Sequence, residues 1–126
     1  MPVILQVALG GAIGASVRYL SGSAAIRLFG SGFPYGTMFV NIFGSFIMGF
    51  AAFYMLERMD GSYARFAPFI LTGVLGGFTT FSAFSLDALF LIERSRFLAA
   101  AIYMGGSVAL AVLALFAGMA IARSLV

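Results

Sequence analysis

The chain has 126 residues, of which 63% are hydrophobic and only 9% are charged. Soluble domains are typically about 45–50% apolar and about 25% charged, so this chain lacks the polar surface of a soluble globule. Its seven cations are all arginines and are scattered, which excludes the basic patch of a nucleic-acid-binding protein. The sequence has no cysteine and no histidine, which excludes disulfides, zinc sites and a nucleophile–base pair of the kind that many enzymes use.

Four long apolar runs follow one another, separated by charges and by clusters of Pro and Gly. A membrane-spanning helix needs about 20 apolar residues. We therefore expect one all-α integral membrane domain over residues 1–126, and we expect the N-terminus, which lacks a signal-peptide pattern, to belong to the mature chain. The four transmembrane helices are predicted at about residues 3–20, 35–56, 66–92 and 97–122.

The third run differs from the others because Gly73–Thr80 contains three glycines and two threonines, which are poor material for a continuous helix. Non-helical backbone within a membrane persists only where protein or a water-filled cavity satisfies its polar groups. We therefore predict a third helix that is broken near its middle, at about Gly76–Thr80. The alternative is a glycine-lined packing face, which also explains the small residues of the other helices.

The arginines show almost no bias between the two sides of the membrane. Three share a side with the N-terminus and four lie on the opposite side, and orientation follows only from a clear excess. We therefore predict insertion in both orientations and an antiparallel, dual-topology homodimer, with a fixed topology as the alternative. The two sets are Arg58, Arg65 and Arg123 against Arg18, Arg27, Arg94 and Arg96.

Few polar side chains lie deep within the predicted spans. Asn41 is preceded by Thr37 and followed by Ser45, each one turn away, so the three form a polar line on one helix face. Such a line serves either hydrogen bonding between helices or a polar pathway. Asn41 is the strongest candidate for function, because its amide needs several partners.

The third run continues with Phe81 and Phe84, which share a helix face and are compatible with ordinary core packing. No ionised group is expected near the middle of a span, since Arg18 and Asp87 fall toward the ends of theirs. The remaining donors are neutral amide and hydroxyl groups, together with the positive edges of aromatic rings. Such groups suit a pathway with weak serial sites for a small anion.

Three segments resemble the signatures of the Fluc/CrcB family of fluoride channels. Gly10–Tyr19 is similar to the first-helix signature, Gly36–Gly44 to the second-helix motif, and Gly73–Ser85 to the third-helix motif at almost every position. The short segment Glu93–Arg96 also fits. The resemblance runs through the whole chain in order, so three independent motifs carry it.

The resemblance implies a passive channel that exports fluoride to relieve its toxicity, with two pores in each antiparallel homodimer. On that analogy Asn41 donates to fluoride, and Phe81 and Phe84 turn their ring edges toward the ions. The resemblance also implies a structural sodium ion at the dimer axis, held by the backbone carbonyls of Gly76 and Thr79, with no organic cofactor. The other pore residues expected are Thr37, Ser107, Tyr103 and Ser82.

The family resemblance also places Arg18 near the membrane–water boundary, where it would draw anions inward, cap carbonyls or simply extend to the water. Asp87 stands where many family members have Glu, and Ala111 and Leu115 stand where some have Ser or Thr. Phe78 replaces a common Leu and is expected to serve packing. The expected location is the bacterial inner membrane, as a multi-pass protein.

Two other classes of membrane protein compete with a channel. A small dual-topology, proton-coupled multidrug antiporter needs a membrane-embedded carboxylate, for which Asp87 is the only candidate. A non-transporting assembly protein would account for the glycines but not for Asn41 beside a broken helix.

Overall fold

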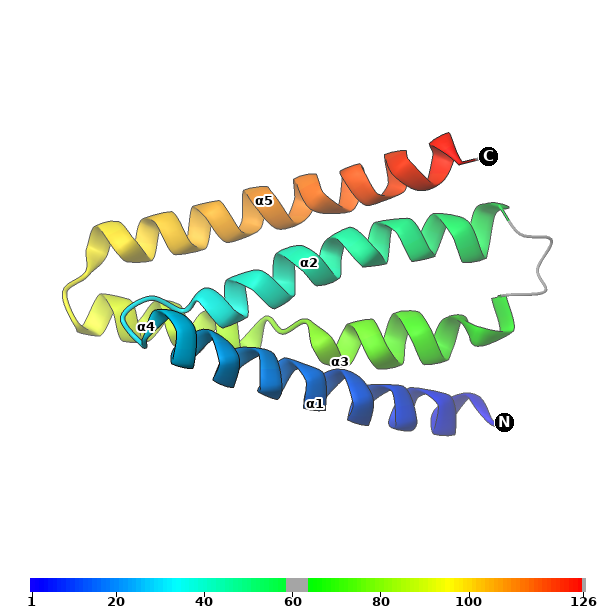
Figure 1. The fold of residues 1–126 in the computed structure, drawn as a ribbon, viewed down its shortest axis with the longest axis horizontal. Coiled ribbons are helices and arrows are strands. Elements are labelled where there is room, and N and C mark those ends of the chain that lie inside the picture. The colour runs from blue at the N-terminus through cyan, green and yellow to red at the C-terminus, as the bar shows by residue number, and fades with distance from the viewer. Residues whose placement is uncertain (59–63, 126) are drawn as a thin grey trace.

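The computed structural model describes residues 1–58 and 64–125 of the chain. Within them, four helical segments are long and apolar enough to cross a membrane, which confirms the predicted all-α, four-span architecture. The segments are Val3–Phe29, Tyr35–Met55, Ala64–Glu93 and Phe97–Ser124. Figure 1 shows them side by side along the long axis, with both termini at one end of the bundle.

The first helix, α1, spans Val3–Phe29 and so extends nine residues beyond the predicted end at Leu20. The small residues that follow Leu20 include no proline, and they continue the helix. The helix ends only at Gly30, whose φ of 81° is readily available to glycine alone. The predicted boundary was therefore wrong, and Arg18 lies near the middle of α1 rather than at its end.

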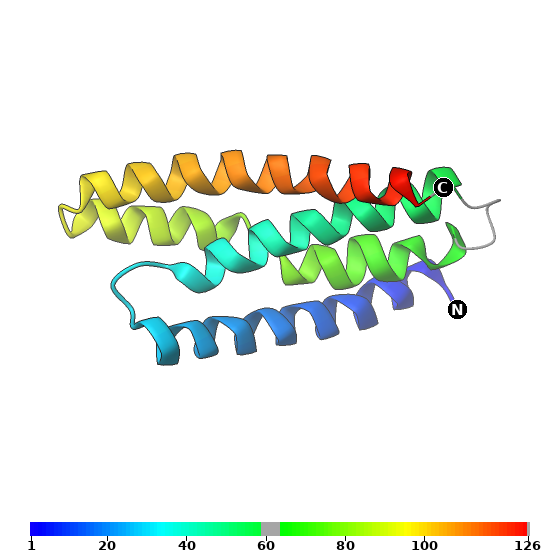
Figure 2. The same cartoon turned by 45° about the horizontal axis from the view of Figure 1, so that its top comes forward.

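The second helix, α2, spans Tyr35–Ala52, directly after Pro34, and continues as a π-helical segment over Phe53–Arg58. The last helix, α5, spans Phe97–Ser124. Both agree with the predicted spans to within a few residues. Figures 1 and 2 show α5 running alongside α2, with α1 on the opposite side of the bundle.

The third span is assembled from short pieces. A 3₁₀ turn at Ala64–Phe66 precedes a π-helical segment, Pro68–Leu75, and the short helix α3, Gly76–Phe78. Thr79 then takes an extended conformation (φ −87°, ψ 158°), and helix α4 spans Ser82–Glu93. The predicted break is confirmed, and Figure 1 shows it as the thin stretch between α3 and α4.

Glycines allow the helices to pack backbone against backbone. A Cβ on Gly118 would lie 2.0 Å from the carbonyl oxygen of Phe46, and one on Gly14 would lie 2.0 Å from that of Val74. These distances are far below van der Waals contact, so no larger residue fits. The predicted role of these glycines in close helix packing is therefore confirmed.

At the end of the bundle away from the termini, the α1–α2 link contacts the start of α5. The link between α1 and α2 is the segment Gly30–Pro34, and Arg96, at the start of α5, donates a hydrogen bond from Nη1 to the carbonyl oxygen of Gly32. The ring of Phe33 in the same link packs edge-on against Tyr103, with centroids 5.5 Å apart. These contacts fix the link over one end of the bundle.

Candidate anion pathway

The side chain of Asn41 is paired with the backbone of Thr80 at the break. Its Nδ2 donates to the carbonyl oxygen of Thr80 at 2.9 Å, and its Oδ1 accepts from the N–H of Thr80 at 2.8 Å. An amide side chain has the same donor and acceptor pattern as a backbone peptide, so Asn41 satisfies both backbone groups at once. The unwound backbone is thereby held open without an unpaired group at Thr80.

The same contacts release two carbonyls from helical pairing. In a continuous helix the N–H groups of Thr80 and Ala83 would donate to the carbonyls of Gly76 and Thr79. Thr80 instead donates to Asn41, and the Ala83 N–H donates to the Thr80 hydroxyl at 3.1 Å. The carbonyl oxygens of Gly76 and Thr79 are therefore not used by their usual helix partners.

A hollow of about 380 Å³ opens beside the break, and we call it the break hollow. It contains four of the residues predicted for the pore and both residues predicted for sodium. All ten lining residues found in the described part of the chain are uncharged. They are Asn41, Ser45, Gly76, Thr79, Thr80, Phe81, Phe84, Ser107, Val108 and Ala111.

Phe81 and Phe84 are adjacent, as their spacing predicts, with ring centroids 5.5 Å apart and planes inclined by 45°. Their surroundings differ. Phe84 is 9% exposed and lies 5.1 Å from the ring of Tyr103, whereas Phe81 is 76% exposed. Phe84 is thus fixed within the helical bundle, and Phe81 projects from it.

Two further predicted pore residues lie on α5. Ser107 is 4% exposed, and its hydroxyl has no hydrogen-bond partner among the described residues. The hydroxyl of the fully buried Tyr103 donates to Oδ2 of Asp87 at 3.1 Å, and the Thr37 side chain is another hydrogen-bonding neighbour of Tyr103. The polar groups thus continue from Ser107 toward Asp87.

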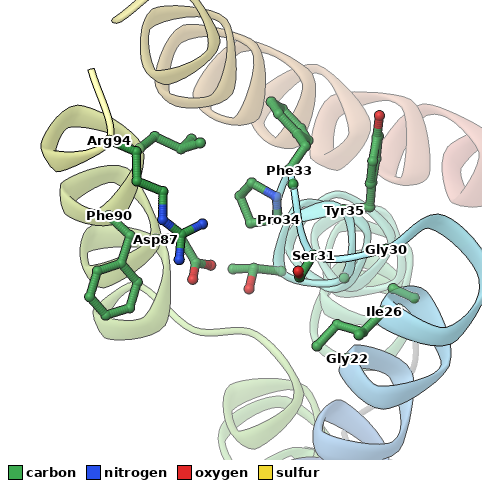
Figure 3. A pocket seen from close by; sticks show the side chains of 15 residues that line it. Gly22, Ile26, Gly30, Ser31, Phe33, Pro34, Tyr35, Asp87, Phe90 and Arg94 are labelled. Atoms are coloured by element: carbon green, nitrogen blue, oxygen red, sulfur yellow. The ribbon is translucent and has the colours of Figure 1, made fainter. Parts of the chain in front are cut away.

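Thr37 and Asp87 line a second hollow of about 180 Å³ beneath the link, which we call the link hollow. Figure 3 shows Asp87, from α4, and Arg94, the residue that directly follows α4, projecting into it opposite the link residues Gly30, Ser31 and Pro34. The sequence did not identify Arg94 as part of the site. The available signals were its position seven residues after Asp87, about two helical turns further on, and its place in the segment Glu93–Arg96 that fits the family.

Arg18 contacts the third span beside the break. Its Nε donates to the carbonyl oxygen of Gly77 at 3.0 Å, close to the middle of the third span. The guanidinium group therefore satisfies a backbone carbonyl beside the break, as one of the expected roles supposed. Its position near the membrane–water boundary stays a prediction, although α1 continues well beyond the apolar run that ended close to Arg18.

Three predicted pore residues, Thr37, Tyr103 and Ser82, are not among the residues that line the break hollow, and of these Ser82 does not line the link hollow or neighbour Tyr103 either. It is exposed, and its hydroxyl lies 3.4 Å from that of Thr80. Phe78 is 7% exposed and packs edge-on against Phe43, which confirms its packing role. Thr80, whose backbone and hydroxyl organise the break, was not named as a site residue from the sequence, although it lay at the end of the predicted break and within the third-helix motif.

The family model and the similar proteins described below all match this chain over nearly its full length. The model of the family described as CrcB-like protein, Camphor Resistance (CrcB), matches residues 5–119. A protein of Cereibacter sphaeroides named fluoride-specific ion channel FluC is 55% identical over 120 residues, covering 95% of this chain and 94% of its own. One of Rhizobium meliloti with the same name is 47% identical over 123 residues, covering 98% of each chain.

A third relative, fluoride-specific ion channel FluC 2 of Nitrobacter hamburgensis, is 50% identical over 122 residues and covers 96% of this chain and 97% of its own. All three relatives are bacterial, and all match over the four spans found in the structure. The chain is a multi-pass membrane protein that belongs to the CrcB family of fluoride ion channels, which is not a family of enzymes.

Proposed function

We propose that this chain is a fluoride-selective, passive channel that exports fluoride and so relieves its toxicity. The observation that carries the proposal is the break hollow, whose ten lining residues in the described part of the chain are uncharged and include several hydrogen-bond donors. An anion that leaves water needs donors in place of its hydration shell. A carboxylate in that position would repel it.

The donors differ in kind. Asn41 uses one N–H of its amide to hold Thr80, which leaves the other N–H for an ion. On α5, the hydroxyl of Ser107 has no hydrogen-bond partner in the part of the chain that the structure describes. Phe81 and Phe84 both line the hollow, and the edges of their aromatic rings are electropositive. Fluoride would thus meet several weak sites in series, which favours fast passage.

Beyond the hollow, we assign the outer part of the route to Thr37, Tyr103 and the link hollow. Thr37 supports this assignment because it lines the link hollow and neighbours the Tyr103 hydroxyl. Arg94, which lines the same hollow, adds a positive charge at its mouth and would offset Asp87. Ser82 would contribute through Thr80 rather than by direct contact with the route.

A structural sodium ion fits the break. Sodium is a hard cation that prefers oxygen ligands, as calcium and magnesium do. The carbonyls of Gly76 and Thr79 have lost their helical donors, and both residues line the same hollow. These two residues would hold the ion, which would neutralise the partial negative charge of the carbonyls and bind two protomers together.

The exposure of Phe81 at the break supports a homodimer, whose antiparallel arrangement follows from the dual topology argued below. Phe81 is 76% exposed, and unwound backbone facing lipid would cost several kcal/mol for each unsatisfied group. A second copy of the chain covers this face most simply, because a two-fold axis brings the same surface from each protomer together. Each dimer would then contain two equivalent pathways.

The distribution of arginines supports dual topology. Because Arg18 lies inside α1, it no longer counts toward either end of the bundle. Three arginines then remain at each end, and those at one end are Arg27, Arg94 and Arg96. The other end keeps Arg58, Arg65 and Arg123. Such balance gives the chain no preferred orientation. The bacterial relatives favour the inner membrane as its location.

The test is fluoride efflux from liposomes that contain the purified protein, followed with a fluoride-selective electrode and with a chloride electrode in parallel. We expect rapid fluoride efflux down its gradient, no chloride efflux, and no dependence on a proton gradient. Fluoride efflux that needs a proton gradient would contradict passive transport, whereas the absence of fluoride efflux would favour the multidrug antiporter, with Asp87 as its carboxylate. A well-folded protein that transports no fluoride would contradict the proposal.

A further inference from the structure

The hydroxyl of Ser45 remains unexplained by the pathway described above. Ser45 lies on α2, one turn after Asn41, and lines the break hollow together with Ser107 and Ala111. Nothing in the family resemblance gave it a role. Its hydroxyl could supply a further hydrogen-bond donor to this hollow.

The number of donors in the hollow is smaller than the sequence suggests. The amide oxygen of Asn41 and one of its N–H groups are hydrogen-bonded to Thr80, so a single N–H is left to bind an ion. On α5, Ser107 supplies one hydroxyl, but one turn further on the wall is formed by Ala111, which has none. Beyond Ser107, α5 therefore supplies no donor to this hollow.

Serine hydroxyls in helices can fold back onto a carbonyl of their own helix. Ser16 does so onto Ala12 at 2.6 Å, and Ser85 onto Phe81 at 3.1 Å. Within the described residues no such bond, and no other hydrogen bond, occupies the hydroxyl of Ser45. Ser107 is alike in this respect, and both line the same hollow.

We infer that Ser45 is a further fluoride-contacting residue, whose hydroxyl carries the pathway along α2 past the point where α5 offers only Ala111. Asn41, Ser45 and Ser107 then form a donor set drawn from two facing helices. The inference rests on the proposed channel function and deepens it. It makes Ser45 a determinant of anion passage rather than of helix packing.

The test compares fluoride efflux from liposomes for the wild type, Ser45→Ala and the double variant Ser45→Ala/Ala111→Ser. A hydrogen bond to an ion is worth about 1.5–3 kcal/mol, so loss of the Ser45 hydroxyl should slow efflux at least about tenfold. Ala111→Ser restores a hydroxyl to the lining of the same hollow, from α5, so the double variant should recover most of the flux. A packing role for Ser45 would not be rescued in this way.

Ser16→Ala is the matched control, because that exposed hydroxyl is bonded within its own helix and should be dispensable. If Ser45→Ala fails to fold, Ser45→Gly removes the same hydroxyl without adding bulk. Unchanged efflux in a folded Ser45 variant, or no recovery in the double variant, overturns the inference while wild-type efflux keeps the channel function. A wild type without fluoride efflux overturns both.

Discussion

Asn41 and Thr80 form a closed pair in which one side-chain amide satisfies both the N–H and the carbonyl of one backbone residue, at 2.8 and 2.9 Å. The pair joins α2 to the break in the third span. It also diverts the donor that Gly76 would otherwise receive, so the same contact opens the helix and exposes a carbonyl. One residue on a continuous helix thus determines the shape of a neighbouring discontinuous one.

Asn41→Asp is expected to abolish fluoride efflux. The carboxylate can still accept from the Thr80 N–H, but it cannot donate to the Thr80 carbonyl, and it places a negative charge in the anion path. Asn41→Ala loses both hydrogen bonds and should lower the free energy of unfolding by about 1–3 kcal/mol for each group left unpaired. Efflux assays and thermal unfolding in detergent check the two variants, and fluoride flux retained by Asn41→Asp would refute a pore role for this residue.

Phe81→Ile is expected to reduce fluoride conductance strongly. Isoleucine keeps an apolar side chain in the break hollow but removes the electropositive ring edge. Phe78→Leu is the matched control, because Phe78 is buried outside the hollow and should affect stability more than flux. Single-channel or liposome recordings make the comparison, and equal conductance in Phe81→Ile and the wild type would reduce Phe81 to a packing residue.

Removal of sodium from both sides of the membrane is expected to impair the assembled channel. The ion would be held by main-chain oxygens of Gly76 and Thr79, so no side-chain substitution removes the site cleanly. The measurement is fluoride efflux and dimer content after exchange of sodium for N-methylglucamine at constant ionic strength. Channels indifferent to this exchange would argue against a structural ion at the break.

Arg18→Ala is expected to destabilise the protein by about 1–3 kcal/mol, because it leaves the Gly77 carbonyl unpaired near the middle of the bundle. Arg27→Ala removes the same charge from the end of α1 and serves as the control. Thermal unfolding of both variants in detergent provides the measurement. A similar change in melting temperature for the two would show that the bond to Gly77 contributes little.

Gly118→Ala is expected to disrupt the packing of α5 on α2. The added Cβ would lie 2.0 Å from the Phe46 carbonyl oxygen, and overpacking of this kind costs about 1–3 kcal/mol or more. Gly105→Ala is a control on the same helix, where a Cβ meets nothing within 4 Å. The yield of monodisperse protein and its melting temperature should fall for the first variant only.

The sequence by itself determined the class of protein, the number of spans and the position of the break. Apolar runs of the right length predict membrane helices whatever their partners, and Gly and Thr at 73–80 weaken a helix locally. Asn41, Phe81 and Phe84 were also identified from the sequence, because a polar side chain in an apolar span and a characteristic motif are both local signals.

Only the tertiary structure decided how these residues are used. The end of α1 at Phe29 depends on the chain conformation at Gly30, and the bond from Arg18 to Gly77 joins residues 59 positions apart. The pairing of Asn41 with Thr80 likewise joins two helices, and it leaves a single amide N–H free. Such long-range hydrogen bonds leave no periodic trace in a sequence, because they depend on how separate helices meet in space.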